Sequence, residues 1–470
     1  MIGIDWVMMI LYFVILIFMG IAAVRSLKSM DDFAIAGHKV PASVVFATLS
    51  ASFIGAGYTM GTAAKGYSGG IGFLFIIGAF SIQTTLVGIF IAPKLREYEN
   101  AYTIGDIMGY HFGPLARLLT GIIAIIFCAG IVGVVARASG FVLQSVAGIP
   151  FVYGVILSAG IVVLYAAVGG MWSVVQTDIL QFVVIVIAVP LVLLLGLSDV
   201  GGVGGLVEKI PGEFLRPFHK FSFVAFIGPF LGFLLGETLV PPYAQRAFVS
   251  TDVKGARAGF IASGIYSFIW FFIVIAIGIV AYPLVPNVDP DAAMVEMVLK
   301  FLPHGMIGFV IASIVCVIMS TQDSFLNSGA THFFRDVYKP FFHPAVSDRG
   351  AIMVGRLFTI IMGVLGIVFA ISIPSLIDGL LYIYALWAPT IILPLVIVAL
   401  WKKASPYCGV YAIVFGGLVT ALWIWVFKNP WGIDGLIPGI IANQIAFWVV
   451  HYLTKDWKEI SRVFAPESSS

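Results

Sequence analysis

Charged residues are scarce in this chain. Aspartate, glutamate, lysine and arginine make up 10% of its 470 residues, whereas hydrophobic residues make up 61%. A typical soluble protein has about 25% charged and about 45–50% apolar residues. Because so little charge cannot cover a water-soluble particle, the composition predicts a protein surrounded by lipid. The net charge of +2 does not indicate nucleic-acid binding; only the positions of the charges are informative.

Cysteine is also rare. The chain has three cysteines, Cys128, Cys316 and Cys408, each within or at the edge of an apolar segment and none close to another. This spacing excludes the usual zinc-binding patterns and a disulfide framework. We interpret the three thiols as buried and inert.

The N-terminus lacks the features of a cleaved signal peptide. No basic region precedes its apolar run, which follows Asp5 and extends over residues 6–24, and no small-residue cleavage site follows. A run of this length can cross a hydrocarbon core about 30 Å thick. We therefore expect a retained transmembrane helix.

Apolar segments continue along the whole chain and are too long for the strands of a membrane barrel. They predict an all-α polytopic membrane protein with a single transport domain over residues 1–470. The thirteen expected spans are 6–24, 42–64, 70–92, 118–145, 151–168, 173–197, 222–247, 256–283, 305–334, 351–375, 379–401, 407–427 and 436–453.

Lysine and arginine are distributed unequally between the two sides of these spans. If the N-terminus lies outside, 18 of them fall in cytoplasmic connections, Arg246 included, and 6 fall outside. The positive-inside rule favours this orientation. It predicts a multi-pass protein of the cell membrane whose tail, residues 454–470, is cytoplasmic.

Two spans contain residues that interrupt helices. The second has glycines at 55, 57 and 61, and the seventh has Pro241 and Pro242. The two lie five crossings apart, so they enter the membrane in opposite senses. Such a pair in two inverted halves indicates the binding site of a transporter. Glycine and proline are also common at tight packing points of membrane helices, which is the alternative interpretation.

The ninth span carries Ser320, Thr321, Asp323 and Ser324 on two helical turns. Hydroxyl and carboxylate oxygens are ligands that hard cations prefer. The hydroxyls can instead bond to their own helix. An acid such as Asp323 is costly in hydrocarbon unless it is paired or solvated, so it is a candidate for function.

Three further ionisable residues, Arg137, Asp178 and Glu237, lie within spans. Arg137 can bind a substrate carboxylate, extend to the membrane surface or pair with Glu237. Asp178 lies near the predicted cytoplasmic end of its span, where a structural role and ion binding are both open. No nucleophile–base pair, phosphate-binding loop or metal-ligand cluster occurs in the connecting loops, so the sequence does not suggest an enzyme.

Several motifs resemble the sodium:solute symporter family. They are the stretch from Gly169 to Gln181, with its Gly-Gly and Thr-Asp pairs, the segment from Ser320 to Ser324, Gln245-Arg246, and Trp401-Lys402-Lys403. These motifs stand in the same order as in that family, and the resemblance extends over about residues 45–425. The resemblance implies a leucine-transporter-like core of two inverted five-helix repeats, residues 42–197 and 222–401. One extra N-terminal span and two C-terminal spans, 407–453, flank this core.

The resemblance also implies a main sodium site. Its ligands would be the carbonyl oxygens of Ala51, Ile54 and Val317 and the hydroxyls of Ser320 and Thr321. Some members bind a second sodium ion, and the matching residues here are Asp178, Asp323 and Ser324. Because Asp323 stands where some of those members have serine, this second site can hold sodium, a proton or nothing.

The run from Ala129 to Arg137 is similar to the proline-transporter branch of that family. The chain departs from that branch at two places. It has Phe53 where an acidic residue is usual, and the run after Gly236 also differs. These departures leave proline itself open as the substrate.

Together these features predict sodium-driven import of a small organic solute by alternating access, and a monomer suffices for this mechanism. The expected substrate contacts are Phe53, Tyr58, Arg137, Glu237 and Trp387. An amino acid such as proline is the first candidate; a monocarboxylate and a quaternary amine are alternatives. Proton coupling through Asp178, Asp323 or Glu237, and a solute sensor of the same fold, also remain open.

Overall fold

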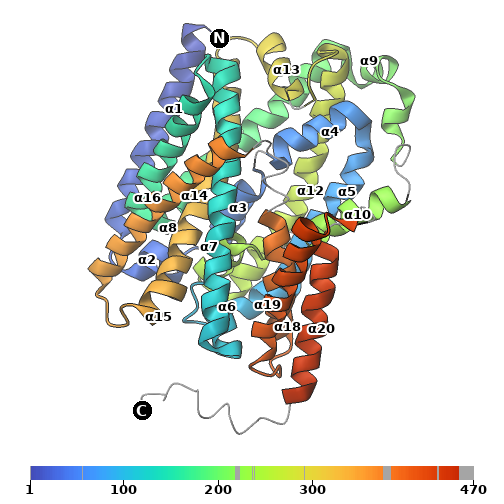
Figure 1. Cartoon of the computed structure of the whole chain (residues 1–470). Coiled ribbons are helices and arrows are strands. Elements are labelled where there is room, and N and C mark those ends of the chain that lie inside the picture. The colour runs from blue at the N-terminus through green and yellow to red at the C-terminus, as the bar shows by residue number, and fades with distance from the viewer. Residues whose placement is uncertain are drawn as a thin grey trace.

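The chain folds almost entirely into helices, which confirms the predicted all-α class (Figure 1). The computed structural model describes residues 2–55, 57–217, 223–235, 237, 239–290, 292–373, 383–430, 433 and 435–454. Within these ranges the one β-pairing is an isolated bridge between Val40 and Ser250. Gly236, residues 379–382 of the predicted eleventh span and the predicted tail from residue 455 lie outside them.

The described part of the first half of the chain contains nine α-helices. They are α1 (Gly3–Ala22), α2 (Met30–Ile35), α3 (Ala42–Phe53), α4 (Thr62–Gly69), α5 (Phe73–Leu86), α6 (Ala92–Arg96), α7 (Ile104–Ala147), α8 (Phe151–Val200) and α9 (Gly202–Lys209). Two π-helical segments, Gly57–Gly61 and Val87–Ile91, precede α4 and α6.

The described part of the second half contains α10 (Phe223–Leu235), α11 (Pro241–Val249), α12 (Val253–Leu284), α13 (Ala293–Phe301), α14 (Met306–His332), α15 (Lys339–Phe341), α16 (Asp348–Ser372), α18 (Leu393–Leu400), α19 (Cys408–Ala421) and α20 (Leu436–Thr454). Further π-helical segments are Phe333–Tyr338, Ala388–Ile392 and Leu422–Val426.

Ten of the described helical segments are long and apolar enough to cross a membrane. The predicted spans 151–168 and 173–197 correspond to two helices within α8, which are separated by a kink at Gly170, where the backbone is not helical. There the backbone is left-handed, with φ of 56°, and a Cβ atom would lie 2.6 Å from the Phe33 ring of α2. Glycine therefore permits both the bend and the close approach. The total of thirteen spans stays a prediction, as does the division into repeats.

The helices differ in how much of their surface the protein covers. In α1, α16 and α20 less than a third of the most apolar window is buried, whereas 89% of that window is buried in the segment that contains α14. Large apolar side chains such as Phe18 of α1, 71% exposed, face outward. Because a helix that is apolar on its outer face needs lipid, the molecule is a multi-pass membrane protein with α14 at its centre.

Helix α14 contacts α1, α7, α8 and α16, and it also reaches α3 and α11. Helix α12 packs against α3, α4, α5 and α8, while α19 and α20 form a pair at the edge (Figure 1). The start of α1 and the end of α20 lie at opposite ends of the molecule (Figure 1). Helices α3 and α11, each of which adjoins an interruption, thus meet the central helix inside the bundle.

Candidate functional site

Helix α3 ends in the middle of the second predicted span. Its last residue is Phe53, and Ile54 leaves the helical conformation with φ of −83° and ψ of 40°. Gly55 follows, and helical structure resumes in the π-helical segment Gly57–Gly61, where Thr59 N–H donates to the Gly55 carbonyl at 2.9 Å. The interruption that the glycines predict is therefore present.

The seventh predicted span is interrupted as well. Helix α10 ends at Leu235 and α11 begins at Pro241. Proline suits the first positions of a helix because the N–H groups there have no partner within the helix. Two short helices consequently replace one continuous span, and Glu237 lies between them.

Helix α14 passes the end of α3 with its hydroxyl side chains. Ser320 Oγ lies 2.9 Å from the Ala51 carbonyl oxygen and 3.2 Å from that of Val317. Thr321 Oγ1 lies 3.4 Å from the Ser52 carbonyl oxygen and 3.2 Å from that of Val317. All five residues are buried. The structure thus brings together four of the five predicted ligands of the main sodium site.

The remaining predicted ligand, Ile54, adjoins this group. Its carbonyl oxygen accepts a hydrogen bond from Thr59 Oγ1 at 3.0 Å. The next residue, Gly55, lies against α14, since a Cβ atom built on it would be 2.7 Å from Thr321 Oγ1. Hydroxyl oxygens of α14 therefore lie against carbonyl oxygens at the end of α3, and oxygens of these kinds are ligands that hard cations prefer.

A second polar cluster surrounds Arg246 of α11, which is completely buried. Its Nη2 donates to Ser324 Oγ at 2.6 Å, to Ser52 Oγ at 3.2 Å and to Asp178 Oδ2 at 3.2 Å. Thr48 accepts from Arg246 Nε at 3.2 Å and donates to Asp178. The guanidinium group therefore joins α3, α8 and α14 through α11. Arg246 cannot act as the cytoplasmic loop cation that the orientation count assumed.

Asp323 lies beside this cluster and has other partners. Its Oδ2 accepts from Tyr165 OH at 2.7 Å and from Thr177 Oγ1 at 3.3 Å. Ser324 Oγ is 3.4 Å from its Oδ1. Three residues are predicted to form a second cation site. Two of them, Asp178 and Ser324, accept hydrogen bonds from the Arg246 guanidinium group. The third, Asp323, accepts hydrogen bonds from the hydroxyls of Tyr165 and Thr177.

A small cavity lies between α5 and the start of α11. Its lining includes Phe53, Gln83, Thr84, Glu237 and Tyr243. The Tyr384 hydroxyl donates to Glu237 Oε1. Two predicted substrate contacts, Phe53 and Glu237, therefore share one cavity.

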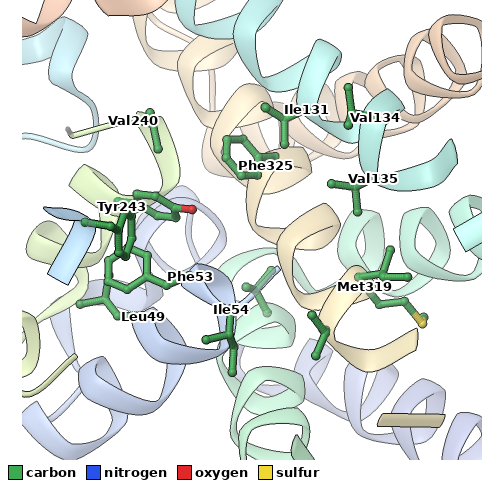
Figure 2. Close-up of a cluster of buried hydrophobic side chains, with 14 of the residues drawn as sticks. Leu49, Phe53, Ile54, Ile131, Val134, Val135, Val240, Tyr243, Met319 and Phe325 are labelled. Atoms are coloured by element: carbon green, nitrogen blue, oxygen red, sulfur yellow. The ribbon is translucent and has the colours of Figure 1, made fainter. Parts of the chain in front are cut away.

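Aromatic rings connect this cavity to its surroundings. Figure 2 shows Phe53 and Tyr243 side by side, and their ring centroids are 4.4 Å apart in an edge-to-face arrangement. Phe80 touches both Phe53, at 5.2 Å, and Tyr58, at 4.9 Å. The Tyr58 hydroxyl also interacts with the carboxyl group of Glu237, so Tyr58 lies next to the cavity. Trp387 is fully buried and packs against Phe127, with centroids 5.2 Å apart, on the α7 side.

Arg137 of α7 lies elsewhere. Its Nη1 donates to the Ala370 carbonyl at 2.8 Å, at the end of α16. The guanidinium carbon is 5.1 Å from the ring centres of both Phe141 and Phe151. These contacts place Arg137 at the interface of α7 with α8 and α16, apart from the other predicted substrate contacts.

The sequence analysis overlooked three features of this site. It assigned no role to Gln83 and Thr84, although a polar pair inside the apolar helix α5 was a usable signal. Tyr384 was not singled out either, and nothing local indicates its bond to Glu237. The pairing of Arg246 with Asp178 joins residues 68 positions apart and depends on the fold.

Among curated proteins, the chain is similar to the osmoregulated proline transporter OpuE of Bacillus subtilis, with 24% identity over 95% of this chain and 94% of the relative. It is also similar to a sodium/glucose cotransporter of Vibrio parahaemolyticus, with 25% identity over 87% and 83%. A sodium/proline symporter of Staphylococcus aureus is 25% identical over 96% and 93%.

Two solved structures share the fold. One shows the substrate-bound, outward-open state of a Na⁺-coupled sialic acid symporter, with a TM-score of 0.85 and 20% identity over 96% of this chain and 98% of that one. The other is MHP1, a nucleobase-cation-symport-1 family transporter, with a TM-score of 0.57 and 15% identity over 93% and 96%. The predicted leucine-transporter-like fold is therefore confirmed.

The model of the sodium:solute symporter family matches residues 33–416, which is most of the chain. The predicted resemblance is confirmed, and the protein is a membrane transporter and not an enzyme. The chain belongs to the sodium:solute symporter family.

Proposed function

We propose that this protein imports a small organic solute by sodium-coupled symport, with an amino acid such as proline as the first candidate. The family and the names of its proline- and glucose-transporting relatives support the coupling. One observation carries the proposal: the Ser320 and Thr321 hydroxyls meet carbonyl oxygens of α3 where that helix ends inside the bundle.

In this proposal sodium is held by the carbonyl oxygens of Ala51, Ile54 and Val317 and by the hydroxyls of Ser320 and Thr321. These ligands come from two elements, the interrupted α3 and the central α14. Binding therefore fixes α3 against α14 and favours the conformations in which the two helices are in contact. Release of sodium allows them to separate, which couples the ion to the change in access.

The driving force comes from the sodium gradient and the membrane potential. In this proposal the N-terminus lies outside and the C-terminus in the cytoplasm. Each positive charge that moves inward across a membrane potential of 100 mV releases about 2.3 kcal/mol of free energy. This energy corresponds to about 50-fold accumulation of the solute. One sodium ion per solute molecule is thus enough for strong uptake.

We expect the second predicted position, at Asp178, Asp323 and Ser324, to bind sodium more weakly than the main site. The reason is that Arg246 already donates to Asp178 and Ser324. A sodium ion there must displace the guanidinium group from buried partners, which costs free energy.

The test is uptake of radiolabelled proline by proteoliposomes that contain the purified protein. We expect accumulation above the external concentration when sodium is outside and potassium inside, and none when potassium is on both sides. Accumulation driven by a pH gradient without sodium would instead support proton coupling. Sodium-dependent proline binding without accumulation would support a sensor.

A matched pair of variants locates the coupling ion. Ser320→Ala removes a proposed ligand, whereas Ser313→Ala removes a hydroxyl of the same helix that is 2.7 Å from the Val310 carbonyl oxygen and has no described contact with α3. We expect the first to raise the sodium concentration for half-maximal uptake about tenfold or more. An equal effect of both variants would contradict the assigned site.

A further inference from the structure

Glu237 places a carboxyl group in the cavity beside the interrupted span. The residue is 7% exposed and lies between α10 and α11. Tyr384 donates to its Oε1, while its Oε2 has no hydrogen-bond partner among the described residues. A buried carboxyl group with half of its bonding capacity unused is costly, so such a group commonly serves a ligand.

The structure provides no counter-cation for this acid within the described ranges. No lysine, arginine or histidine there forms an ion pair with Glu237. The Arg246 guanidinium is bonded to Asp178, Ser52 and Ser324, and Arg137 contacts Ala370. The cavity therefore offers a site for a positive charge that no cationic side chain of the described residues fills.

The start of α11 is poorly suited to an anion. A helix N-terminus normally offers four free N–H groups. Here Pro241 and Pro242 have no N–H group, and that of Tyr243 already donates to the Val240 carbonyl at 2.9 Å. This half-helix therefore offers fewer donors to a carboxylate than a helix start without proline.

Aromatic rings complete the lining. Phe53, Tyr243 and Phe260 all border the cavity, along with the polar Gln83. Ring faces attract an ammonium group, and the attraction increases when water is excluded. The charge of Glu237 and the aromatic lining therefore both favour an ammonium group.

We propose that the transported solute carries a protonated amine that pairs with Glu237 when the lining side chains move apart, because the cavity as it stands has a volume of about 10 Å³, enough for one water molecule. The inference rests on the proposed symport function and specifies its substrate class. Tyr384 is a positioning residue that holds the carboxyl group toward the cavity. A solute whose only charge is a carboxylate does not fit this site.

The experiment compares three five-membered-ring probes of similar shape. Pyrrolidine carries only an amine, proline an amine and a carboxylate, and tetrahydrofuran-2-carboxylate only a carboxylate. Thermal shifts of the purified protein are measured with each probe, in sodium and in potassium. Glu237→Gln removes the charge, Glu237→Asp retains it, and Glu97→Gln alters an exposed acid at the end of α6 as a control.

We expect proline or pyrrolidine to stabilise the protein in sodium and the carboxylate probe to have no effect. Glu237→Gln should raise the dissociation constant of the amine about 10- to 100-fold, because a charge-assisted bond is lost. Glu237→Asp should retain most of the affinity, and Glu97→Gln all of it. A Glu237→Gln protein that still responds to sodium alone shows that the variant is folded.

Three results would overturn the inference: equal binding of the carboxylate probe, unchanged amine affinity in Glu237→Gln, or no response to either amine while sodium alone still stabilises the protein. A protein that shows no difference between sodium and potassium would contradict the proposed function instead. The two failures are therefore distinguishable.

Discussion

The buried pair of Arg246 and Asp178 allows a quantitative prediction about stability. Both side chains are completely buried, and the closest approach of the charged groups is 3.2 Å. Replacing one partner leaves the other as an unpaired charge in the interior, which typically costs about 3–5 kcal/mol. Replacing both removes that penalty. Each single variant, Asp178→Asn or Arg246→Met, should therefore lower the free energy of unfolding by more than half of the loss in the double variant.

The expected shift in melting temperature follows from the size of the chain. An unfolding entropy of about 2.1 cal/mol/K per residue gives about 1 kcal/mol per degree for 470 residues. Each single variant should then melt about 3–5 °C lower than the wild type. The double variant should melt no lower than the single variants, about 3–5 °C below the wild type or less, whereas independent effects would sum to about 6–10 °C.

The assay is a thermal scan of the four purified proteins in one detergent at one heating rate, because melting of membrane proteins is often irreversible. Glu97→Gln is the control. Glu97 forms a shorter ion pair with Lys94, at 2.8 Å, but that pair is exposed to solvent. Its loss should change the melting temperature by less than about 1 °C. Additive effects of the two buried replacements would refute the argument that the pair acts as a unit.

Two glycine replacements test close approaches near the site. Gly55→Ala would place a Cβ atom 2.7 Å from Thr321 Oγ1, so we expect the sodium concentration for half-maximal uptake to rise about tenfold or more. An unchanged concentration would count against the site. Gly278→Ala would place a Cβ atom 1.9 Å from the Ala63 carbonyl oxygen, so a thermal scan should show a melting temperature about 1–3 °C lower. Gly61→Ala would place a Cβ atom with no neighbour within 4 Å outside its own helix, so it is the control for both and should leave uptake and melting unchanged.

Features that depend on local chemistry could be predicted from the sequence. Gly55 and Pro241 coincide with the interruptions because glycine weakens a helix interior, and proline cannot continue a preceding helix without the loss of a hydrogen bond. The hydroxyls of Ser320 and Thr321 lie on one turn of α14, and their position opposite the end of α3 agrees with the family resemblance. The apolar composition was sufficient to predict an all-α membrane protein.

Features that depend on how helices are rotated and packed could not be predicted. Nothing near Arg137 in the sequence shows that α7 directs it toward Ala370 and not toward Glu237. The same is true of Arg246, which the positive-inside count treated as a cytoplasmic charge although it is buried against Asp178. Ion pairs between distant segments follow from the tertiary structure, and a single sequence does not encode them in any local pattern.

The central claim is that sodium binds where α14 meets the end of α3. The most direct measurement is equilibrium binding of radioactive sodium to the purified protein, to the double variant Ser320→Ala/Thr321→Ala and to Ser313→Ala. We predict saturable binding that the double variant weakens about tenfold or more and that Ser313→Ala leaves unchanged. Equal sodium affinity in all three proteins would contradict the account.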